Sequence, residues 1–174
     1  MLVSRPVPAG SRLVPGVLAV LACPPALCPH LEFAAAAVLS SPVSLSWSAQ
    51  PALPGQLRAT LEWQARRGTA GRLASRLRGL GTVCFDVVEG PSPGCDSERY
   101  SYDPSLGLFR AGIAADGSIV VREEALRSLL GEQARGQDLA AELRGLLGTA
   151  WDDALEPLRQ GADGGPVTFL SQVG

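Results

Sequence analysis

The stretch VLAVLACPPALCPHLEFAAAAVL, residues 17–39, decides the fold, because an unbroken apolar run is followed at once by helix signals. Residues 17–22 are all apolar, which is typical of a short central strand buried on both faces. Pro29 suits the first position of a helix with Cys28 as its N-cap, and strong helix formers follow as far as Ser40. The stretch therefore predicts a buried strand that leads directly into a helix.

Two other interpretations of the same residues have to be weighed. The letters VLAC, ending at Cys23, loosely match a lipoprotein cleavage box, and Cys23, Cys28 and His30 together suggest a metal or redox site. A signal peptide needs an uninterrupted apolar region of about 7–15 residues, and a Pro-Gly pair interrupts this one. We therefore expect residues 1–15 to be a flexible leader. No apolar run approaches the ~20 residues of a membrane span, so we expect a cytoplasmic protein without membrane contact.

The next two segments alternate apolar and polar residues with the period of a half-buried strand. They are residues 43–49 and 57–63, separated by the proline-rich loop QPALPG. Residues 68–81 predict a helix with leucines on one stripe, and residues 83–87 predict a fourth strand. The order β-α-β-β-α-β predicts a ferredoxin-like α+β core over residues 16–90, with its first and third strands at the centre. We expect the sheet face away from the helices to be either solvated or covered by the C-terminal part.

Residues 91–174 are expected to form a C-terminal lobe packed on this core. A turn-rich connector spans residues 89–107, and the letters ADG between two short apolar segments predict a β-hairpin. Thr149 and Asp152 have the spacing of a capping box, and PVTFL near the C-terminus predicts an edge strand. The lobe is expected to contain two or three helices, at residues 123–130, at residues 139–147 and from Thr149 onward.

Composition limits the classes of function. The 174 residues are 46% hydrophobic and 18% charged, enough to bury a core, and the formal net charge of −2 gives no general attraction to nucleic acid or membranes. Four cysteines are too sparse to indicate a disulfide framework, so reduced thiols are expected. A zinc site needs four ligands with recognisable spacing, and the chain has one His. We therefore expect no metal and no cofactor.

Nucleic-acid binding through the sheet is not expected. Ferredoxin-like RNA-binding domains stack bases on aromatic side chains of the sheet surface. The polar faces of the two alternating segments carry Ser, Arg, Thr and Glu instead. Trp47, Trp63 and Trp151 all lie on apolar stripes and are expected in the core.

Three segments carry a resemblance to a known family: ALCPHLEFAA, PALPGQLRATLEW and LLGTAWDDALEPLR. From about Gly16 onward, a length on the scale of one domain, the chain resembles a small family of high-GC Gram-positive bacteria described as a domain of unknown function. The resemblance implies no activity and no catalytic residue. Any function has to be inferred from the residues themselves.

Cys28, His30 and Glu32 form one candidate site, at the start of the first helix. A thiol at a helix N-terminus beside an imidazole can have a lowered pKa and act as a nucleophile or a redox sensor. A capping residue, an exposed imidazole and a surface carboxylate explain the same three residues without chemistry. A thiol-dependent enzyme or redox sensor that uses Cys28 with His30 is our alternative hypothesis.

The second candidate site is the arginine-rich start of the second helix, in RRGTAGRLASRLRG. Free N–H groups at a helix start, small residues that allow close approach and several guanidinium groups suit a phosphate or a carboxylate. The segment lacks the glycine spacing and the Lys-Ser/Thr pair of a P-loop. An exposed helix with solvated arginines explains it equally well. The candidate anion-binding residues are Arg66, Arg67, Gly68, Thr69 (also a plausible helix cap), Gly71, Arg72 and Arg76.

Charge is segregated along the chain, with nine acids and four arginines from Glu123 to the end. The arginine helix is therefore expected to dock on acidic helices, within one chain or across a dimer. Asp152, Asp153 and Glu156 suggest a carboxylate site, but the polar face of a helix near its N-terminus explains them without catalysis. The leading hypothesis is a non-enzymatic cytoplasmic module that senses a small anionic ligand, or that binds an acidic protein partner or a second copy of itself.

Overall fold

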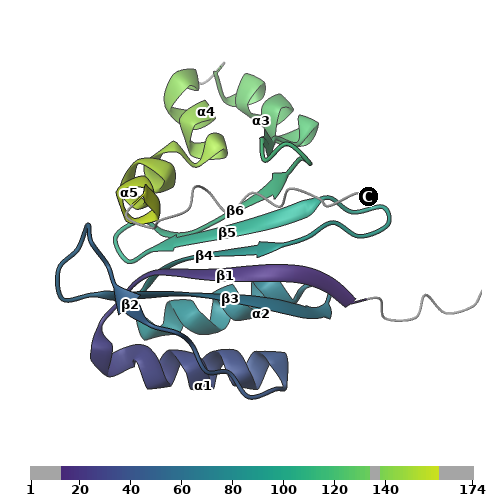
Figure 1. The fold of residues 1–174 in the computed structure, drawn as a ribbon. Helices are drawn as coiled ribbons and strands as arrows, with labels where there is room; N and C mark the ends of the chain where they lie inside the picture. Colours follow the sequence, from purple (N-terminus) through teal and green to yellow (C-terminus); the bar gives the residue numbers. More distant parts are fainter. Residues whose placement is uncertain (1–12, 134–137, 161–174) are drawn as a thin grey trace, which may run out of the picture.

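The fold is a mixed α+β arrangement around one seven-stranded antiparallel sheet, seen in a computed structural model that describes residues 13–133 and 138–160 (Figure 1). The strand order is β2-β3-β1-β4-β5-β6-β7. The strands are β1 (Leu13–Cys23), β2 (Ser48–Ala49), β3 (Leu57–Arg66), β4 (Cys84–Glu89), β5 (Ser97–Asp103), β6 (Gly107–Ile113) and β7 (Ile119–Val120). The helices are α1 (Cys28–Leu39), α2 (Thr69–Leu77), α3 (Glu123–Gln133), α4 (Leu139–Leu147) and α5 (Thr149–Gln160), with 3₁₀ turns at Pro25–Leu27 and Arg78–Leu80.

Strand β1 is buried on both faces, as its apolar sequence predicts. Leu18 and Val20 face one hydrophobic core, and Ala19 and Leu21 face a second core on the other side of the sheet. The strand begins at Leu13 and pairs with β3 from that residue. The expectation that residues 13–15 belong to a leader is therefore wrong, while residues 1–12 lie outside the described residues.

The two faces of the sheet are covered by different helices (Figure 1). Helices α1 and α2 cover one face and enclose the larger core, which contains Leu31, Leu73 and Phe85. On the other face, Leu155 and Leu158 of α5 pack against β1 and β4. Of the two expectations for this second face, coverage by the C-terminal part is confirmed. The boundary expected at residue 90 falls inside one continuous sheet, since β4 pairs with β5.

A glycine allows the closest side-chain approach along β1. Gly16 lies opposite Trp63 of β3, and a Cβ atom placed on Gly16 would be 2.0 Å from Cζ2 of the indole. The indole ring therefore lies on bare backbone. Trp63 is buried, as predicted for the tryptophans, whereas Trp47 and Trp151 are only half-buried.

The strand expected over residues 43–49 is wrong except at its last two residues, Ser48 and Ala49. Glu32 of α1 explains the difference. Its Oε1 atom accepts hydrogen bonds from the backbone N–H of Leu45 at 2.9 Å and from Nε1 of Trp47 at 3.0 Å. The segment thus follows α1 rather than the sheet edge, and its apolar residues pack beside the helix.

The turn-rich connector expected over residues 89–107 is also wrong, because it contains strand β5. Tyr100 and Tyr102 face the larger core, while the intervening Ser101 is fully buried on the other face, where it donates to Asp86 at 2.6 Å. A strand buried on both faces normally reads as an apolar run. On the second face of β5 a buried polar residue bonds to a polar partner, so the sequence of β5 lacks the continuous apolar run of a doubly buried strand.

The remaining C-terminal predictions mostly hold. Strands β6 and β7 form the predicted hairpin, with Gly117 at φ +85°, and α4 ends at Gly148 as predicted. The capping box of Thr149 and Asp152 is wrong, because Asp152 binds arginines instead. The edge strand expected at PVTFL lies outside the described residues. None of the described helices has both the length and the apolar character needed to cross a membrane.

Candidate functional site

A carboxylate of the chain itself, that of Glu89, is bound at the start of α2. Glu89, the last residue of β4, is fully buried. Its Oε1 atom accepts from the backbone N–H of Gly68 at 2.8 Å, and its Oε2 atom accepts from that of Ala70 at 3.0 Å. The positive end of the helix dipole stabilises a carboxylate at this position. Two backbone donors at the start of α2, those of Gly68 and Ala70, are therefore occupied by Glu89.

A sequence signal for this contact exists. Glu89 shares the parity of Phe85 and Val87 in a short apolar strand, so it points into the same core as they do. A carboxylate buried in that way needs strong hydrogen-bond donors. The N–H groups at the start of α2 are donors of this kind.

Thr69 is the first residue of α2, so its expected role as a cap is wrong; Gly68 occupies the cap position at φ +86°. The hydroxyl of Thr69 donates to the carbonyl of Arg66 at 2.7 Å. The same oxygen accepts from Nη2 of Arg72 at 2.7 Å. Thr69 thus anchors the first turn of the helix and is not available to a ligand.

Arg66 and Arg67 point in different directions. Arg66 pairs with Leu13 in the β1–β3 ladder, and the alternation along β3 places its side chain on the face away from α2. Arg67 donates to the carbonyl of Asp96 at 2.9 Å and forms an ion pair with Glu98 at 3.8 Å. The structure therefore does not bring the seven predicted residues into one anion site.

Two of the predicted arginines remain beside an open depression. Arg72 and Arg76 line it together with Gly68, Gly71, Ser75 of α2 and Val38 of α1, and its volume is about 520 Å³. Both arginine side chains are exposed, and no carboxylate within the described ranges lies within 4 Å of either guanidinium. This depression is what remains of the predicted site.

The neighbouring helix α1 presents an apolar outer face. Phe33 is 72% exposed, the largest exposed fraction among the large apolar side chains of the described residues. Pro29 and Ala37, on the same side of the helix, are also exposed. An amphipathic surface helix normally turns polar residues outward. Helix α1 exposes Pro29, Phe33 and Ala37 beside His30, so its outer face is largely apolar and is suited to contact another molecule.

Cys28 lies at the first residue of α1 rather than at the predicted N-cap, which is Leu27. Its Sγ atom is 3.9 Å from Sγ of Cys23, and both residues are buried. Burial raises the pKa of the Cys28 thiol, and burial together with the neighbouring Cys28 raises the pKa of Cys23 to about 12. His30 is exposed on another side of the helix. The side chain that contacts the Cys28 thiol is therefore a second thiol, that of Cys23, and not the imidazole.

The described residues contain no group of three or more His, Cys, Asp or Glu side chains arranged to hold a metal ion. Glu32, the third member of the first candidate cluster, is occupied by its bonds to Leu45 and Trp47. The three residues of that cluster therefore serve separate roles.

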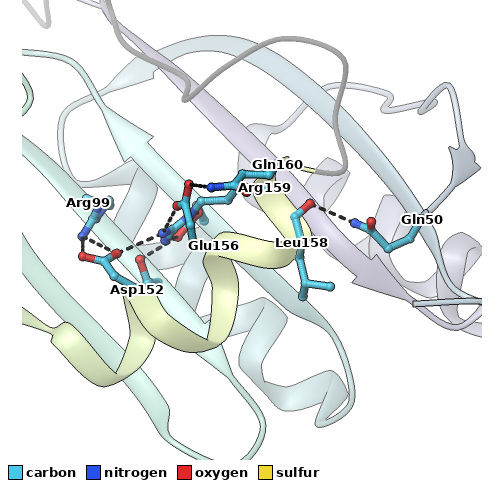
Figure 2. Close-up of polar contacts among 9 residues, drawn as sticks. Gln50, Arg99, Asp152, Glu156, Leu158, Arg159 and Gln160 are labelled. Atoms are coloured by element: carbon cyan, nitrogen blue, oxygen red, sulfur yellow. Dashed lines mark hydrogen bonds and ion pairs between the residues drawn. The ribbon is translucent and has the colours of Figure 1, made fainter. Parts of the chain in front are cut away.

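The other face of the sheet holds an ion-pair network that sequence reasoning missed (Figure 2). Arg159 of α5 donates to both oxygens of Asp86, at 2.8 and 3.1 Å, and to Asp152 at 2.9 Å. Arg99 of β5 also donates to Asp152, at 3.2 Å. Burial alone would lower the pKa of Arg159, but the bonds and charges of the two aspartates raise it. The network fixes α5 to the sheet.

The suspected carboxylate site at Asp152, Asp153 and Glu156 is explained by this network. Asp152 and Glu156 both accept from Nη1 of Arg159, while Asp153 is exposed. Gln50, which is 2% exposed, strengthens the attachment by donating to the carbonyls of Leu21 and Leu158 (Figure 2). Since α5 and α2 cover opposite faces of the sheet, the arginine helix does not dock on α5 within one chain.

Comparison with known proteins gives one match. A family model described as "Protein of unknown function (DUF3145)" matches residues 17–172. No curated protein and no solved structure matches the chain.

Proposed function

The chain belongs to the DUF3145 family of proteins of unknown function, and from its surface we propose a non-enzymatic protein-interaction module. Its binding surface is the α1–α2 face, which we define by Phe33, Val38, Arg72, Ser75 and Arg76. The partner is a protein segment that carries carboxylates beside an apolar anchor. The observation that carries the proposal is the pair of exposed arginines without an acidic partner beside an open depression, on a helix that packs against α1, which exposes Phe33.

Arg72 and Arg76 belong to the half of the described arginines that form no ion pair, together with Arg58, Arg66, Arg78 and Arg144, and among these they line the depression. Arg67, Arg99, Arg110, Arg127 and Arg159 each form an ion pair with an acid of their own chain. Arg72 and Arg76 do not do so within the described residues, although they lie one turn apart on the same helix. Two uncompensated guanidiniums in register attract carboxylates and orient them. An acidic partner satisfies this charge.

The apolar component comes from α1. Aromatic residues that fill a partner's pocket dominate the energy of many interfaces, and arginine is the other residue type enriched at such positions. Phe33 supplies the aromatic residue, and Arg72 and Arg76 supply the arginines. The depression between the two helices, bordered by Val38, gives the partner's own apolar side chain a place to lie.

Two features favour a protein partner over a small anion. The depression is open rather than enclosed, whereas small-molecule sites bury most of the ligand surface. Glu89 also occupies two of the backbone donors at the α2 start, those of Gly68 and Ala70. An enzymatic role for Cys28 with His30 is disfavoured because the Cys28 thiol contacts Cys23 and the carbonyl of Pro24 rather than the imidazole.

Binding of a labelled helical peptide tests the proposal. The peptide carries glutamates on one face and leucines with one tryptophan on the other, and fluorescence anisotropy measures its Kd. The double variant Arg72→Gln/Arg76→Gln is expected to weaken binding about tenfold, as loss of complementary interface charges does. Phe33→Ser is expected to weaken it by at least about fivefold, as loss of an aromatic anchor does.

Arg144→Gln is the matched control, because Arg144 is an exposed arginine of α4, a helix on the other side of the sheet from α1 and α2 (Figure 1), and it should leave the Kd unchanged. A peptide with glutamine in place of glutamate should bind more weakly to the wild-type chain. Unchanged binding by the double variant contradicts the proposal. Displacement of the peptide by millimolar phosphate identifies the site as one for a small anion instead. Loss of self-association in Phe33→Ser, seen by sedimentation, identifies a second copy as the partner.

We also propose that β1–β4 with α1 and α2 are a ferredoxin-like unit extended by β5, β6 and β7. The order β4-β1-β3-β2, its antiparallel pairing and the two helices on one face support this assignment. A cytoplasmic location is proposed on the four free cysteines, since reducing compartments keep thiols in that form. Fractionation of cells that express the tagged chain tests the location.

A further inference from the structure

Two cysteine thiols lie close together at the connection between β1 and α1. Cys23 is the last residue of β1, Cys28 is the first residue of α1, and the turn between them begins with two prolines. The two Sγ atoms are 3.9 Å apart, and both thiols lie near the carbonyl oxygen of Pro24, at 3.5 and 3.7 Å. The fixed φ angles of prolines restrict this turn. The turn therefore holds the thiols close together.

The other two cysteines lack such a neighbour. The thiol of Cys84 is buried and contacts Asp103 at 3.8 Å, and Cys95 lies exposed in the loop before β5. Among the described residues, Cys23 and Cys28 are the pair placed for thiol chemistry with each other.

We propose that Cys23 and Cys28 are a modification site: a dithiol that becomes an intramolecular disulfide by exchange with a low-molecular-weight disulfide such as oxidised glutathione. The Cys28 thiolate attacks one sulfur of glutathione disulfide, forming a mixed disulfide and releasing one glutathione thiolate. The Cys23 thiolate then attacks Sγ of Cys28 and releases the second. Both protein protons end on the two glutathione molecules, the protein loses two electrons and the external disulfide gains them.

The geometry requires a modest movement. A disulfide bond is about 2.05 Å long, so the two sulfurs, now 3.9 Å apart, must approach by about 2 Å. Cys28 is the entry point because it retains 7% exposure, whereas Cys23 has none. The external disulfide therefore reaches Cys28 first.

The order of the two steps also follows from the charges. Burial is the largest of three causes that raise the pKa of Cys23 to about 12. The other two are the charge of Cys28 and the hydrogen bond between the two thiols. A mixed disulfide at Cys28 carries no charge and no S–H group, so both causes disappear. The second step thus becomes easier once the first has occurred. Since burial raises the pKa of Cys28 as well, the first step should accelerate as pH rises.

The test uses the full chain incubated with oxidised glutathione at neutral and at alkaline pH, then alkylated, digested and weighed by mass spectrometry. The expected product is a peptide in which Cys23 and Cys28 resist alkylation and whose mass is lower by about two units, the two hydrogens lost. Dithiothreitol should restore both alkylation sites. The yield should be higher at alkaline pH.

Variants separate the two roles. Cys23→Ser should accumulate a lasting glutathione adduct on Cys28, because nothing resolves it, and Cys28→Ser should leave Cys23 free. Cys84→Ser, the matched buried control, should form the internal disulfide as the wild type does. Cys23→Ala replaces Cys23→Ser if the latter fails to give a cooperative thermal melt. A persistent Cys28 adduct on the wild-type chain, or no reaction of either thiol, overturns the proposal without bearing on peptide binding at Arg72.

Discussion

Arg159 binds both carboxylate oxygens of Asp86, from Nε at 2.8 Å and from Nη2 at 3.1 Å, across the contact between α5 and β4. The two side chains are separated by 73 positions in the sequence. Asp86 is 8% exposed and also accepts from Ser101. A charge buried in this way depends on its partner, so the pair is a charge-assisted, two-bond link between α5 and the sheet.

Arg159→Met should destabilise the protein, because it leaves the buried charge of Asp86 unpaired. The expected loss in the free energy of unfolding is about 3 kcal/mol, measured by urea denaturation. Arg144→Met, an exposed helical arginine, should change it by less than about 0.5 kcal/mol. Adding Asp86→Leu to Arg159→Met should recover part of the loss. Equal effects of the two arginine variants would show that the pair contributes nothing.

Glu89→Ala should create the anion site that the sequence suggested. The variant leaves the N–H groups of Gly68 and Ala70 without acceptors, at a cost of about 1–3 kcal/mol. Sodium acetate should then raise the melting temperature of the variant more than that of the wild type, with sodium chloride at the same ionic strength as the reference. Glu89→Gln keeps one acceptor oxygen and should respond less. An equal response of wild type and variant would argue against an anion pocket.

Acid should weaken the link between β5 and its neighbours at Glu98. Burial alone would raise the pKa of Glu98, but bonds from Arg110 and Tyr100 and the nearby arginine charges outweigh it and lower the pKa. A lowered folded-state pKa gives stability that is present above the unfolded value of about 4.3 and is lost as pH falls through the folded value. Glu98→Gln should therefore cost about 1 kcal/mol at pH 7.

The difference between wild type and Glu98→Gln should shrink as the pH falls below that of the unfolded carboxyl group. Urea denaturation at neutral pH and at about pH 3 gives the comparison. A difference that is the same at both pH values would mean that ionisation of Glu98 does not stabilise the fold.

Gly16→Ala should be strongly destabilising, since the added Cβ would lie 2.0 Å from the Trp63 ring. Displacing a buried indole should cost about 3 kcal/mol or more. Gly79→Ala is the matched control, because nothing lies within 4 Å of a Cβ there, and it should be close to neutral. Tryptophan emission during urea denaturation reports both. A near-neutral Gly16→Ala would mean that the ring moves freely.

Local patterns predicted those elements whose environment matches their sequence. Strand β1 reads as a doubly buried strand and is one, and the Asp116-Gly117 hairpin follows from turn chemistry. Two segments failed because side chains from elsewhere decide them. Glu32 takes the backbone donor of Leu45, and Asp86 satisfies Ser101 inside β5. Neither partner can be identified from the segment itself.

The structure separates the residues of the candidate anion site for a related reason. Helix polarity correctly indicated that an anion belongs at the α2 start, but the anion comes from Glu89, 19 positions after Ala70. The alternation along β3 places Arg66 on the sheet face away from Arg72, so the separation of these two arginines was predictable from the sequence. The turn between Cys23 and Cys28 brings the two thiols together. The prediction that paired Cys28 with His30 considered only the helix and not this turn.

Because β1 carries apolar residues on both faces, hydropathy cannot tell one register of this strand from the next. A slip by one position would exchange the side chains of the two cores with almost no change in polarity. Only at Gly16 does the strand have the notch that admits an indole ring. The fit of the Trp63 ring over Gly16, rather than hydrophobicity, thus fixes the register of β1 against β3.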